Sequence, residues 1–573
     1  MNHESHAVSR RSFFAGAAAT GALAAFGLAG CAPKVGEQPT PEQINESSSA
    51  PSWLGEAPEI SNIVETVDCE VLVVGAGCSG LPAAAQAAQL GLDLVVCEKS
   101  NHVGDTHFDI GAINSRFTPA DHQVNKGRLL NELNRYASFK NDSEVSKVWI
   151  DESAGTIDWL LDIFKDQELT FTVDEENGSD FRAGGTDYYI PWQMHRLTPT
   201  DPTKMPWIAH NELLKDYLEK NGYEISFNHD LVKLVRESGE GGRVTGAIFQ
   251  TPNGYKQVNA SKGIVLACGG YAGNPDMVKG INPIVPKCVT TCDYNQNNTG
   301  AGIKAGMWVG AAKDTDPAAM IFDRGGVEPG VDAGYIQEGK NLVFPGHVQQ
   351  LGVGSMPFLK VDRNGERITN ESANYDAICH AAAHRPGGVW CEVFDVNAPE
   401  DVQRFRTQGC SNNVWRNTLN GHSVDEAYAA EIEAGVIMKA DTLDELADKL
   451  GFEGDAKAQF LASIDRYNEL YDKGEDEDMG KEAYRLSAIR QAPFYGAWFG
   501  GSLLNTLDGL RINKYMQVID TESNVIPGLY AAGTTSGSFY SGNYPVYIVG
   551  NCMGRNITFG RRAVLHIAGE LDK

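Results

Sequence analysis

The pattern of apolar and polar positions is most regular between residues 68 and 98. Residues 71–74 form a short run of Val and Leu, which is typical of a buried parallel strand. An alanine-rich segment that extends to Leu90 has helical composition, and a second apolar run at 92–97 predicts another strand. The order strand, helix, strand predicts a βαβ unit and places the chain in the α/β class.

The turn between the first strand and the helix reads GAGCSG and begins at Gly75. Gly75 allows the tight turn, Gly77 lets a pyrophosphate approach backbone N–H groups at the helix start, and Gly80 permits close packing of helix on strand. Ser79 lies in the same turn. Glu98 follows the second strand, where its carboxylate can accept both hydroxyls of an adenosine ribose. This pattern predicts a dinucleotide-binding site; the alternative is a glycine-rich turn with a purely structural role.

The N-terminal residues are typical of an export signal. Arg10 and Arg11 stand in the sequence SRRSFF, a twin-arginine signature, and the Ala/Gly/Leu segment 15–30 that follows is too short for a stable membrane span. The sequence LAGC, which ends at Cys31, is similar to a bacterial lipobox with Cys31 as the lipidated residue; the alternative is an ordinary cleaved signal. We therefore expect export by the twin-arginine translocase and lipid anchoring to the outer face of the cytoplasmic membrane.

The composition and net charge of the chain argue against some classes of binding partner. The 573-residue chain has 42% hydrophobic residues and a formal net charge of −27, which argues against nucleic acid as a partner. Its eleven cysteines are scattered, and Cys288 and Cys292 form the only close pair. Nothing near that pair completes a four-ligand site, and no CxxCH sequence for haem attachment occurs. We expect no metal site.

Several downstream motifs indicate a family. Residues 103–114 read VGDTHFDIGAIN, 263–270 read GIVLACGG, and 298–305 read NTGAGIKA. Residues 525–533 read VIPGLYAAG, and a final helical segment follows from about residue 550. Together these motifs resemble the fumarate reductase/3-ketosteroid dehydrogenase superfamily of FAD enzymes, from about residue 68 to the end of the chain.

The resemblance implies FAD as the cofactor. Besides Gly75, Gly77, Ser79, Gly80 and Glu98, it implies cofactor contacts at Lys99, Asp105, Thr106, Gly111, Ala112, Val232, Gly270, Gly533 and Asn551. No second GxGxxG unit for a nicotinamide and no covalent-attachment segment is found in the sequence, so we expect non-covalent FAD. Electrons must then pass to or from another carrier, such as a membrane cytochrome or a quinol-linked carrier.

The resemblance also implies the domain organisation. We expect a Rossmann-like two-dinucleotide-binding FAD domain with an inserted α+β cap domain. A twin-arginine signal with lipobox occupies 1–31 and a flexible linker 32–66. The FAD domain comprises 67–340 and 498–573, and the cap domain 341–497.

The predicted substrate site differs from that of fumarate reductases. In GERITNESANYD (365–376), the position of their proton-donating Arg is held by Tyr375, as in 3-ketosteroid dehydrogenases. Asn505 stands where fumarate reductases carry a substrate-binding His. Tyr544 is followed by Pro, which is similar to the Tyr-Pro of ketosteroid dehydrogenases that holds a substrate carbonyl, although their following GPG is absent. The resemblance thus implies Tyr375 and Tyr544 as catalytic residues and Asn505 and Tyr547 as substrate-binding residues.

These replacements change the expected substrate. A dicarboxylate needs guanidinium and imidazolium partners, whereas tyrosines form a neutral, aromatic pocket. Such a pocket suits an enone, an unsaturated lactone or a phenylpropenoid- or stilbene-like C=C bond. A phenol with a pKa near ~10 is protonated at neutral pH, so Tyr375 can donate a proton during reduction. Tyr375, Tyr544 and Tyr547 could instead be packing residues, and Arg367 and Glu371 are interpreted as cap-domain structure.

The sequence therefore predicts an exported FAD-dependent oxidoreductase that reduces an activated C=C bond in anaerobic respiration. Hydride would come from flavin N5 and the proton from Tyr375. One alternative is a 3-ketosteroid dehydrogenase that works in the oxidative direction. Another is a flavin-binding lipoprotein without catalytic activity.

Overall fold

The computed structural model describes residues 51–571, apart from 105–107, 174–177, 181–188, 192, 205–207, 239–240, 294–296, 347 and 406–417. Arg10, Arg11, Cys31, Asp105 and Thr106 lie outside the described residues. Within the described part of the chain, no helix combines the length and apolar character needed to cross a membrane.

The predicted βαβ unit is present. It consists of β1 (Ile63–Val74), α3 (Gly80–Gln89) and β2 (Leu94–Cys97), with β1 parallel to β2. The apolar run predicted as a strand is the C-terminal third of β1, where Val71, Leu72 and Val73 are fully buried. Burial on both faces explains its continuous apolar sequence, since parallel strands are covered by helices on both sides.

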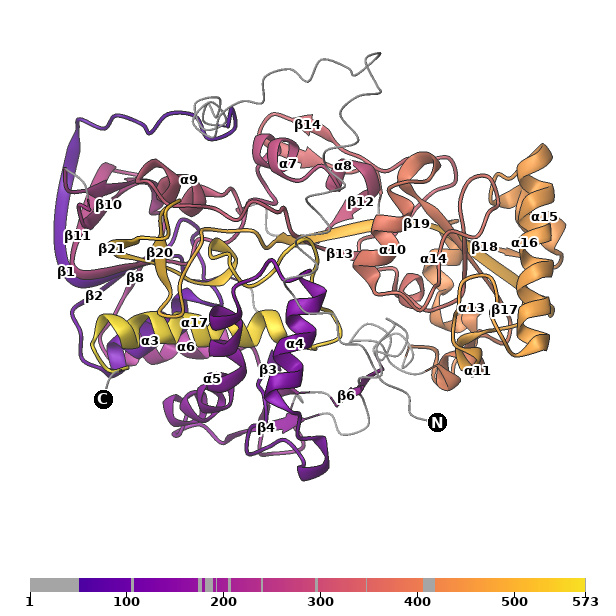
Figure 1. The fold of residues 1–573 in the computed structure, drawn as a ribbon, viewed down its shortest axis with the longest axis horizontal. Helices are drawn as coiled ribbons and strands as arrows, with labels where there is room; N and C mark the ends of the chain where they lie inside the picture. Colours follow the sequence, from indigo (N-terminus) through magenta and orange to yellow (C-terminus); the bar gives the residue numbers. More distant parts are fainter. Residues whose placement is uncertain are drawn as a thin grey trace, which may run out of the picture. The chain divides into compact units, whose positions relative to one another are not determined.

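Around this unit the chain builds an eight-stranded sheet in the order β20-β21-β11-β1-β2-β8, with β10 and β9 continuing from β11. The strands are β8 (Ile225–Ser226), β9 (Asp230–Arg236), β10 (Val244–Thr251), β11 (Gly254–Leu266), β20 (Gln517–Ile519) and β21 (Val525–Ala531). Helix α17 (Asn551–Ile567) packs against α3 beside this sheet (Figure 1). The start of α3 lies against the middle of α17, where Gly560 adjoins Ser79, and the N-terminus of α17 lies at Gly111.

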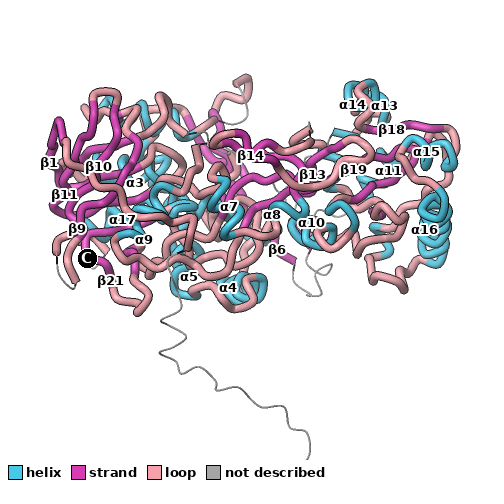
Figure 2. The backbone as a smooth tube through the Cα atoms, turned by 90° about the horizontal axis from the view of Figure 1, so that it is seen from above, coloured by secondary structure: helices cyan, strands magenta, loops and turns pink. Residues whose placement is uncertain are grey.

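A six-stranded second sheet forms the core of the cap. Its strands are β12 (Val289–Cys292), β13 (Ala319–Val327), β16 (Leu359–Val361), β17 (Trp390–Asp395), β18 (Ile437–Ala440) and β19 (Phe494–Thr506). Figure 2 shows β13 and β19 side by side in their antiparallel pairing. Helices α10 (Tyr375–Ala382) and α16 (Gly454–Lys473) pack on this sheet.

The cap sheet differs from the predicted cap boundaries of 341–497. It takes β12 and β13 from before residue 341, and β19 continues past residue 497 to Thr506. The reason is pairing: the C-terminal part of the 13-residue β19 pairs with β12 on one edge and with β13 on the other, and its N-terminal part pairs with β17 and β18. A single strand thus connects the cap sheet to the FAD domain.

The remaining α-helices and β-strands of the described chain are as follows. The helices are α4 (Lys126–Tyr136), α5 (Ser143–Ile163), α6 (His210–Lys220), α7 (Pro275–Ile281), α8 (Val285–Cys288), α9 (Ala301–Trp308), α11 (Ala398–Arg404), α13 (Val424–Ala427), α14 (Ala429–Glu433) and α15 (Leu443–Lys449). The strands are β3 (Ile110–Gly111), β4 (Leu169–Val173), β5 (Gly178–Asp180), β6 (Tyr189–Pro191), β7 (Met194–Pro199), β14 (Ile336–Glu338) and β15 (Asn341–Val343).

The predicted linker 32–66 is wrong for its last part. Leu54 is buried, and the indole N–H of Trp308 donates a hydrogen bond of 3.0 Å to the carbonyl oxygen of Gly55. Strand β1 already begins at Ile63, which pairs with Tyr255 of β11. The residues therefore pack on the domain despite their polar composition, because a long-range strand pairing supplies partners for their backbone.

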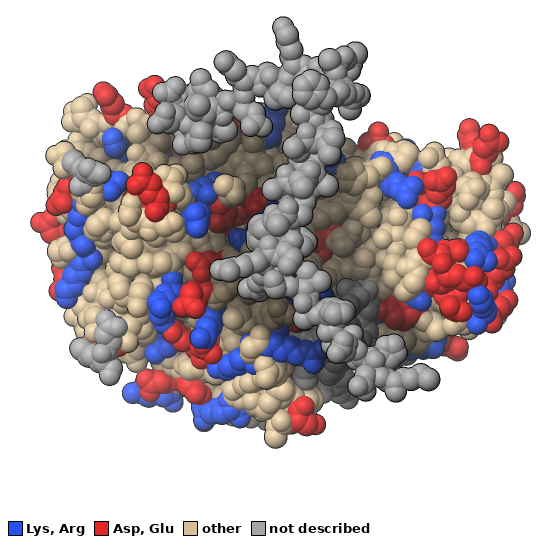
Figure 3. Space-filling model, in the orientation of Figure 1, with Lys and Arg blue, Asp and Glu red and all other residues tan. Residues whose placement is uncertain are grey.

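Most of the acidic side chains between residues 431 and 482 are exposed, whereas Asp476 is buried. Figure 3 shows acidic and basic side chains gathered at the end of the molecule that carries α15 and α16 in Figure 1. Exposed pairs such as Lys449–Glu445 at 2.8 Å and Lys473–Glu475 at 3.7 Å lie there. Exposed pairs of this kind contribute little stability, so this face affects solubility rather than the site.

Candidate active site

The three glycines of the turn that follows β1 are needed for different structural reasons. A Cβ atom on Gly75, whose φ is +104°, would lie 2.3 Å from the carbonyl oxygen of Ala267. A Cβ atom on Gly80 would lie 1.7 Å from the carbonyl oxygen of Gly75. At Gly77 nothing lies within 4 Å of such an atom, so its backbone is open to the cavity described below. Two glycines therefore serve packing and one leaves room for a ligand.

The carboxylate of Glu98 is held beside this turn. One of its oxygens accepts a hydrogen bond from the Ala76 amide, and the other accepts one from the Ser100 amide, each at 2.8 Å. An ionised carboxylate has about four lone-pair sites, so both oxygens can still accept a further hydrogen bond. The neighbouring Lys99 ammonium donates to the Thr299 hydroxyl at 3.2 Å. The acid is thus oriented in advance toward the cavity that it lines.

One cavity of about 760 Å³ extends from this turn to the cap tyrosines. Nine of the predicted site residues line it: Gly75, Gly77, Ser79, Glu98, Lys99, Gly533, Asn505, Tyr375 and Tyr544. Its volume falls in the upper range of small-molecule and cofactor sites. The fold therefore brings the predicted nucleotide residues and the predicted catalytic residues into one continuous space.

Some predicted cofactor residues lie behind the lining. Gly80 packs α3 on the turn, and Gly111 donates from its amide to the Gly550 carbonyl at 2.8 Å. Ala112 is fully buried. A Cβ atom on Gly270 would lie 2.3 Å from the Thr506 hydroxyl oxygen. These four residues are placed to support the cavity wall.

Two other predicted site residues, Val232 and Tyr547, are not among the described residues that line the cavity. Asp230 and Leu231, at the start of β9, line the cavity, whereas Val232 is not among the described lining residues. Tyr547 is not among the described lining residues; its ring packs edge-on against Tyr136, with centroids 5.1 Å apart. The substrate-binding role of Tyr547 therefore stays a prediction, beside a described packing contact of its ring.

Asn551 holds the loop that carries Tyr544. Its side-chain amide donates to the carbonyl oxygens of Pro545 at 3.2 Å and Ile548 at 2.7 Å, and its oxygen accepts from the Tyr540 hydroxyl at 2.6 Å. Asn551 is fully buried and does not line the cavity among the described residues. These contacts orient the loop, and the predicted cofactor contact of Asn551 stays a prediction.

The N-terminus of α17 opens into the cavity. Gly550 precedes the helix with a left-handed φ of 75°, and Cys552, Met553 and Asn556 of its first turns line the space. The N-terminus of a helix carries a partial positive charge, which favours developing negative charge nearby. The sequence predicted a helical segment from about residue 550, and in the fold the first turns of this helix line the cavity.

The cap end of the cavity is aromatic. Tyr375 begins α10, and its ring lies edge-on to Phe322 at 4.7 Å between centroids. The rings of Tyr375 and Tyr544 are parallel within 6°, with centroids 6.3 Å apart. Both tyrosines are almost fully buried, at 4% and 7% exposed. Phe322 belongs to β13, outside the predicted cap range, and no sequence signal marked it.

Asn505 completes this end of the cavity from β19. Its side-chain oxygen accepts a hydrogen bond from the Thr506 amide at 2.8 Å, and its amide group donates to the Thr534 hydroxyl at 3.5 Å. Asn505 presents a neutral amide in the position that the resemblance assigned to a substrate-binding imidazole.

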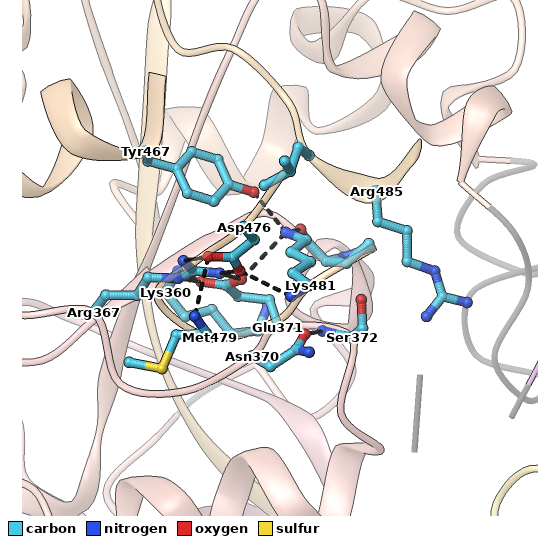
Figure 4. A network of polar contacts seen from close by, with 12 residues as sticks. Lys360, Arg367, Asn370, Glu371, Ser372, Tyr467, Asp476, Met479, Lys481 and Arg485 are labelled. Atoms are coloured by element: carbon cyan, nitrogen blue, oxygen red, sulfur yellow. Dashed lines mark hydrogen bonds and ion pairs between the residues drawn. The ribbon is translucent and has the colours of Figure 1, made fainter. Parts of the chain in front are cut away.

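Arg367 and Glu371 form part of a buried ionic network in the cap (Figure 4). The guanidinium binds both oxygens of Glu371, each at 2.7 Å, and contacts Asp476 at 2.8 Å. Lys481 approaches Glu371 at 3.2 Å. Burial raises the pKa of Glu371, but the charges of Lys481 and Arg367 outweigh it and hold this pKa below its usual value. The network anchors the segment that leads to Tyr375, in agreement with the structural interpretation of these two residues.

The fold and the site define a dinucleotide-binding oxidoreductase with a capped substrate end. The chain belongs to the FAD_binding_2 family, because the family model described as an FAD binding domain matches residues 70–547. The α/β fold class with FAD domain and cap is confirmed, as is the family resemblance.

Similar proteins agree with this class. The chain is 27% identical to vinyl phenol reductase of Lactiplantibacillus plantarum over 512 residues, which covers 87% of this chain and 96% of that protein. It is 24% identical to a probable fumarate reductase of Shewanella frigidimarina, over 86% of this chain and 74% of the other. The structure of 3-ketosteroid Δ1-dehydrogenase from Sterolibacterium denitrificans matches with a TM-score of 0.67 at 19% identity, covering 88% of this chain and 99% of that one, which shows a common fold.

The chain is accordingly a flavin oxidoreductase that acts on CH–CH groups, and the non-catalytic alternative is not supported. The residues present fit FAD. The Gly77 backbone is open to the cavity, the Glu98 carboxylate lines it, and the side-chain oxygen of Asn556 is buried there without a partner in the described part of the chain. An unpaired buried oxygen is costly unless a ligand donor satisfies it.

Proposed function

We propose that this enzyme reduces an activated C=C bond of a neutral, planar substrate, such as an enone, an unsaturated lactone or a phenylpropenoid- or stilbene-like compound. The observation that carries the proposal is the parallel pair of Tyr375 and Tyr544 with Phe322 at the cap end of the cavity. Aromatic faces and edges favour planar π systems through stacked and edge-to-face contacts.

The charges of the lining support a neutral substrate. Among the described residues that line the cavity, no arginine occurs and Lys99 is the single lysine, beside Glu98 at the nucleotide end. A dicarboxylate would bring two negative charges to an end of the cavity lined by tyrosine and asparagine, without the guanidinium partners that offset such charge. The likeness to a protein named vinyl phenol reductase, a name that refers to a neutral aromatic substrate, supports the same class.

The chemistry assigned to the chain's own residues follows from their positions. When bound and reduced by the external electron carrier, the flavin would supply the hydride that adds to the β carbon. The Tyr375 hydroxyl donates the proton to the α carbon, because a phenol is protonated at neutral pH and lies at the cap end of the cavity. The Tyr544 hydroxyl hydrogen-bonds the oxygen that activates the double bond, and the buried walls exclude water.

Anaerobic turnover with a reduced viologen tests the substrate class. The panel comprises fumarate, urocanate, cinnamate-type acids, vinyl phenols, stilbenes, cardenolide lactones and 3-keto-4-ene steroids. We expect turnover of neutral unsaturated compounds and negligible turnover of fumarate. Fumarate as the fastest substrate would overturn the proposal.

The oxidative alternative is a 3-ketosteroid dehydrogenase, favoured by the Tyr375 and Tyr544 pair. In that direction the Tyr375 phenol must lose its proton before it acts, so a neighbouring acceptor is required. Turnover of saturated 3-ketosteroids with an artificial electron acceptor, faster than any reduction in the panel, would favour this alternative.

We also propose that the protein is exported and receives its electrons outside the cytoplasm. The twin-arginine signature at Arg10 and Arg11 and the lipobox at Cys31 support export and lipid anchoring to the outer face of the cytoplasmic membrane. A membrane cytochrome or a quinol-linked carrier would then supply the electrons for anaerobic respiration.

A further inference from the structure

A buried carboxylate lies directly behind the two cap tyrosines. Asp376 follows Tyr375 in the chain, is fully buried, and accepts hydrogen bonds from the Tyr136 hydroxyl at 2.8 Å and 2.6 Å to its two oxygens. Tyr136 is the last residue of α4, which belongs to the FAD domain. This contact joins residues 240 positions apart in the sequence.

The same carboxylate also holds the Tyr544 loop. The backbone amide of Tyr544 donates a hydrogen bond to it, and so does the Ala377 amide, at 3.0 Å. The Asn374 side chain donates to the Tyr136 hydroxyl at 3.4 Å. One carboxylate therefore connects α4, the first turn of α10 and the loop that carries the second cap tyrosine.

We propose that Asp376 and Tyr136 are positioning residues that set the distance and the parallel orientation of Tyr375 and Tyr544. This inference rests on the proposed function, since it assumes that Tyr375 delivers the proton. The two tyrosines come from different parts of the chain, and their ring contact by itself leaves the rings free to slide. The shared carboxylate removes that freedom, because it bonds the backbone of one tyrosine directly and follows the other in sequence. A misplacement of about 1 Å can cost about 10²-fold in rate, so such a constraint affects catalysis.

A carboxylate is required because every described contact to it is a donor. The Tyr136 hydroxyl and the amides of Tyr544 and Ala377 all donate, and an ionised carboxylate accepts on both oxygens. Burial raises the pKa of Asp376 to about 6, and the bonds from Tyr136 and the backbone amides oppose that rise. Asp376→Asn would direct an amide N–H at one of these donors and leave it unpaired.

A double-mutant cycle tests the inference on the full-length enzyme loaded with FAD. Tyr136→Phe and Tyr375→Phe are made singly and together, and kcat and KM are measured with the panel substrate of highest turnover. We expect Tyr136→Phe to lower kcat about tenfold with little change in KM, and to have no further effect in the Tyr375→Phe background, since interacting residues are not additive. Equal losses in both backgrounds would overturn the positioning role.

Tyr271→Phe is the matched control. The Tyr271 hydroxyl donates to both oxygens of the buried Asp508, at 2.8 Å and 2.9 Å, which reproduces the chemistry of the Tyr136 pair outside the cavity lining. We expect this variant to lower thermal stability as Tyr136→Phe does, without its loss of kcat. An equal loss of kcat in the control would overturn the inference. If the single variant Tyr375→Phe retains turnover, the proton-donor role fails as well. If Tyr375→Phe loses turnover but the effects of the two substitutions are additive, the proposed function stands and only the positioning role fails.

Discussion

Tyr375→Phe is the change on which the proposed chemistry depends. It keeps the ring, and with it the edge-on contact to Phe322 at 4.7 Å and the parallel contact to Tyr544 at 6.3 Å. It removes only the hydroxyl. Because Tyr375 is 4% exposed and begins α10, the packing of the cap on this end of the cavity should stay unchanged.

The expected loss is kinetic. General acid catalysis contributes about 10²–10⁴-fold, so kcat should fall by about that factor. KM should change little, because the aromatic surface that binds a planar substrate is retained. Flavin content and the rate of flavin reduction by an artificial donor should stay at wild-type levels, since neither step uses this proton.

The assay is steady-state turnover with reduced viologen, together with single-turnover reoxidation of the reduced enzyme by substrate. Tyr375→Arg supplies a second arm: it installs the acid of fumarate reductases but should create no fumarate turnover, because Asn505 and the Tyr544 loop offer no cationic partner for two carboxylates. A Phe variant that keeps most of its turnover would refute the proton-donor role and return Tyr375 to a packing role.

Three further predictions address cofactor, export and stability. Boiling should release the flavin into the supernatant, and chromophore left on the denatured chain would contradict non-covalent binding. Glu98→Ala should weaken FAD binding by about 2–4 kcal/mol in equilibrium titration, since hydrogen bonds to a charged group contribute ~1.5–3 kcal/mol each. An unchanged affinity would contradict the role of Glu98. Changing Arg10 and Arg11 to Lys should leave folded, FAD-bound precursor in the cytoplasmic fraction, and an unchanged distribution would refute the export signal. Cys31→Ser should release mature protein into the soluble fraction, and an unchanged distribution would refute the lipid anchor. Burial raises the pKa of Asp476, but the Arg367 guanidinium outweighs this and lowers it from 3.8 to about 2. This depressed pKa should contribute about 2 kcal/mol of stability above pH ~4 that is lost as the pH falls toward 2. In thermal unfolding against pH, Asp476→Asn should remove that acid-range loss, and an unchanged profile would show that the pair contributes nothing.

The parts of the fold that were predicted correctly are those encoded by neighbouring residues. The apolar run at 71–74, the glycine turn and the alanine-rich segment each specify their own conformation over a few residues. The same is true of the start of α17, where a glycine precedes a helical sequence. Local pattern and local structure therefore agree wherever a strand or helix follows from its own periodicity.

The errors fall where partners are distant in sequence. The segment before residue 67 has linker composition, yet it pairs with β11. The cap boundary moved because β19 pairs with β12 and β13 as well as with later strands. The packing of Tyr547 on Tyr136, which no sequence signal marked, likewise joins residues that are distant in sequence.

The sequence by itself predicted the βαβ unit with its glycine turn and Glu98 after the second strand, and the family resemblance implied Tyr375 as the proton donor of the cap. Only the tertiary structure decided that Phe322 faces Tyr375, that Tyr544 lies parallel to it, and that Asp376 reaches Tyr136 across 240 positions. The physical reason is that a motif needs only the backbone conformation of adjacent residues. A shared buried carboxylate needs donors from three separate elements, and their meeting is set by strand pairing and helix packing that no single segment encodes.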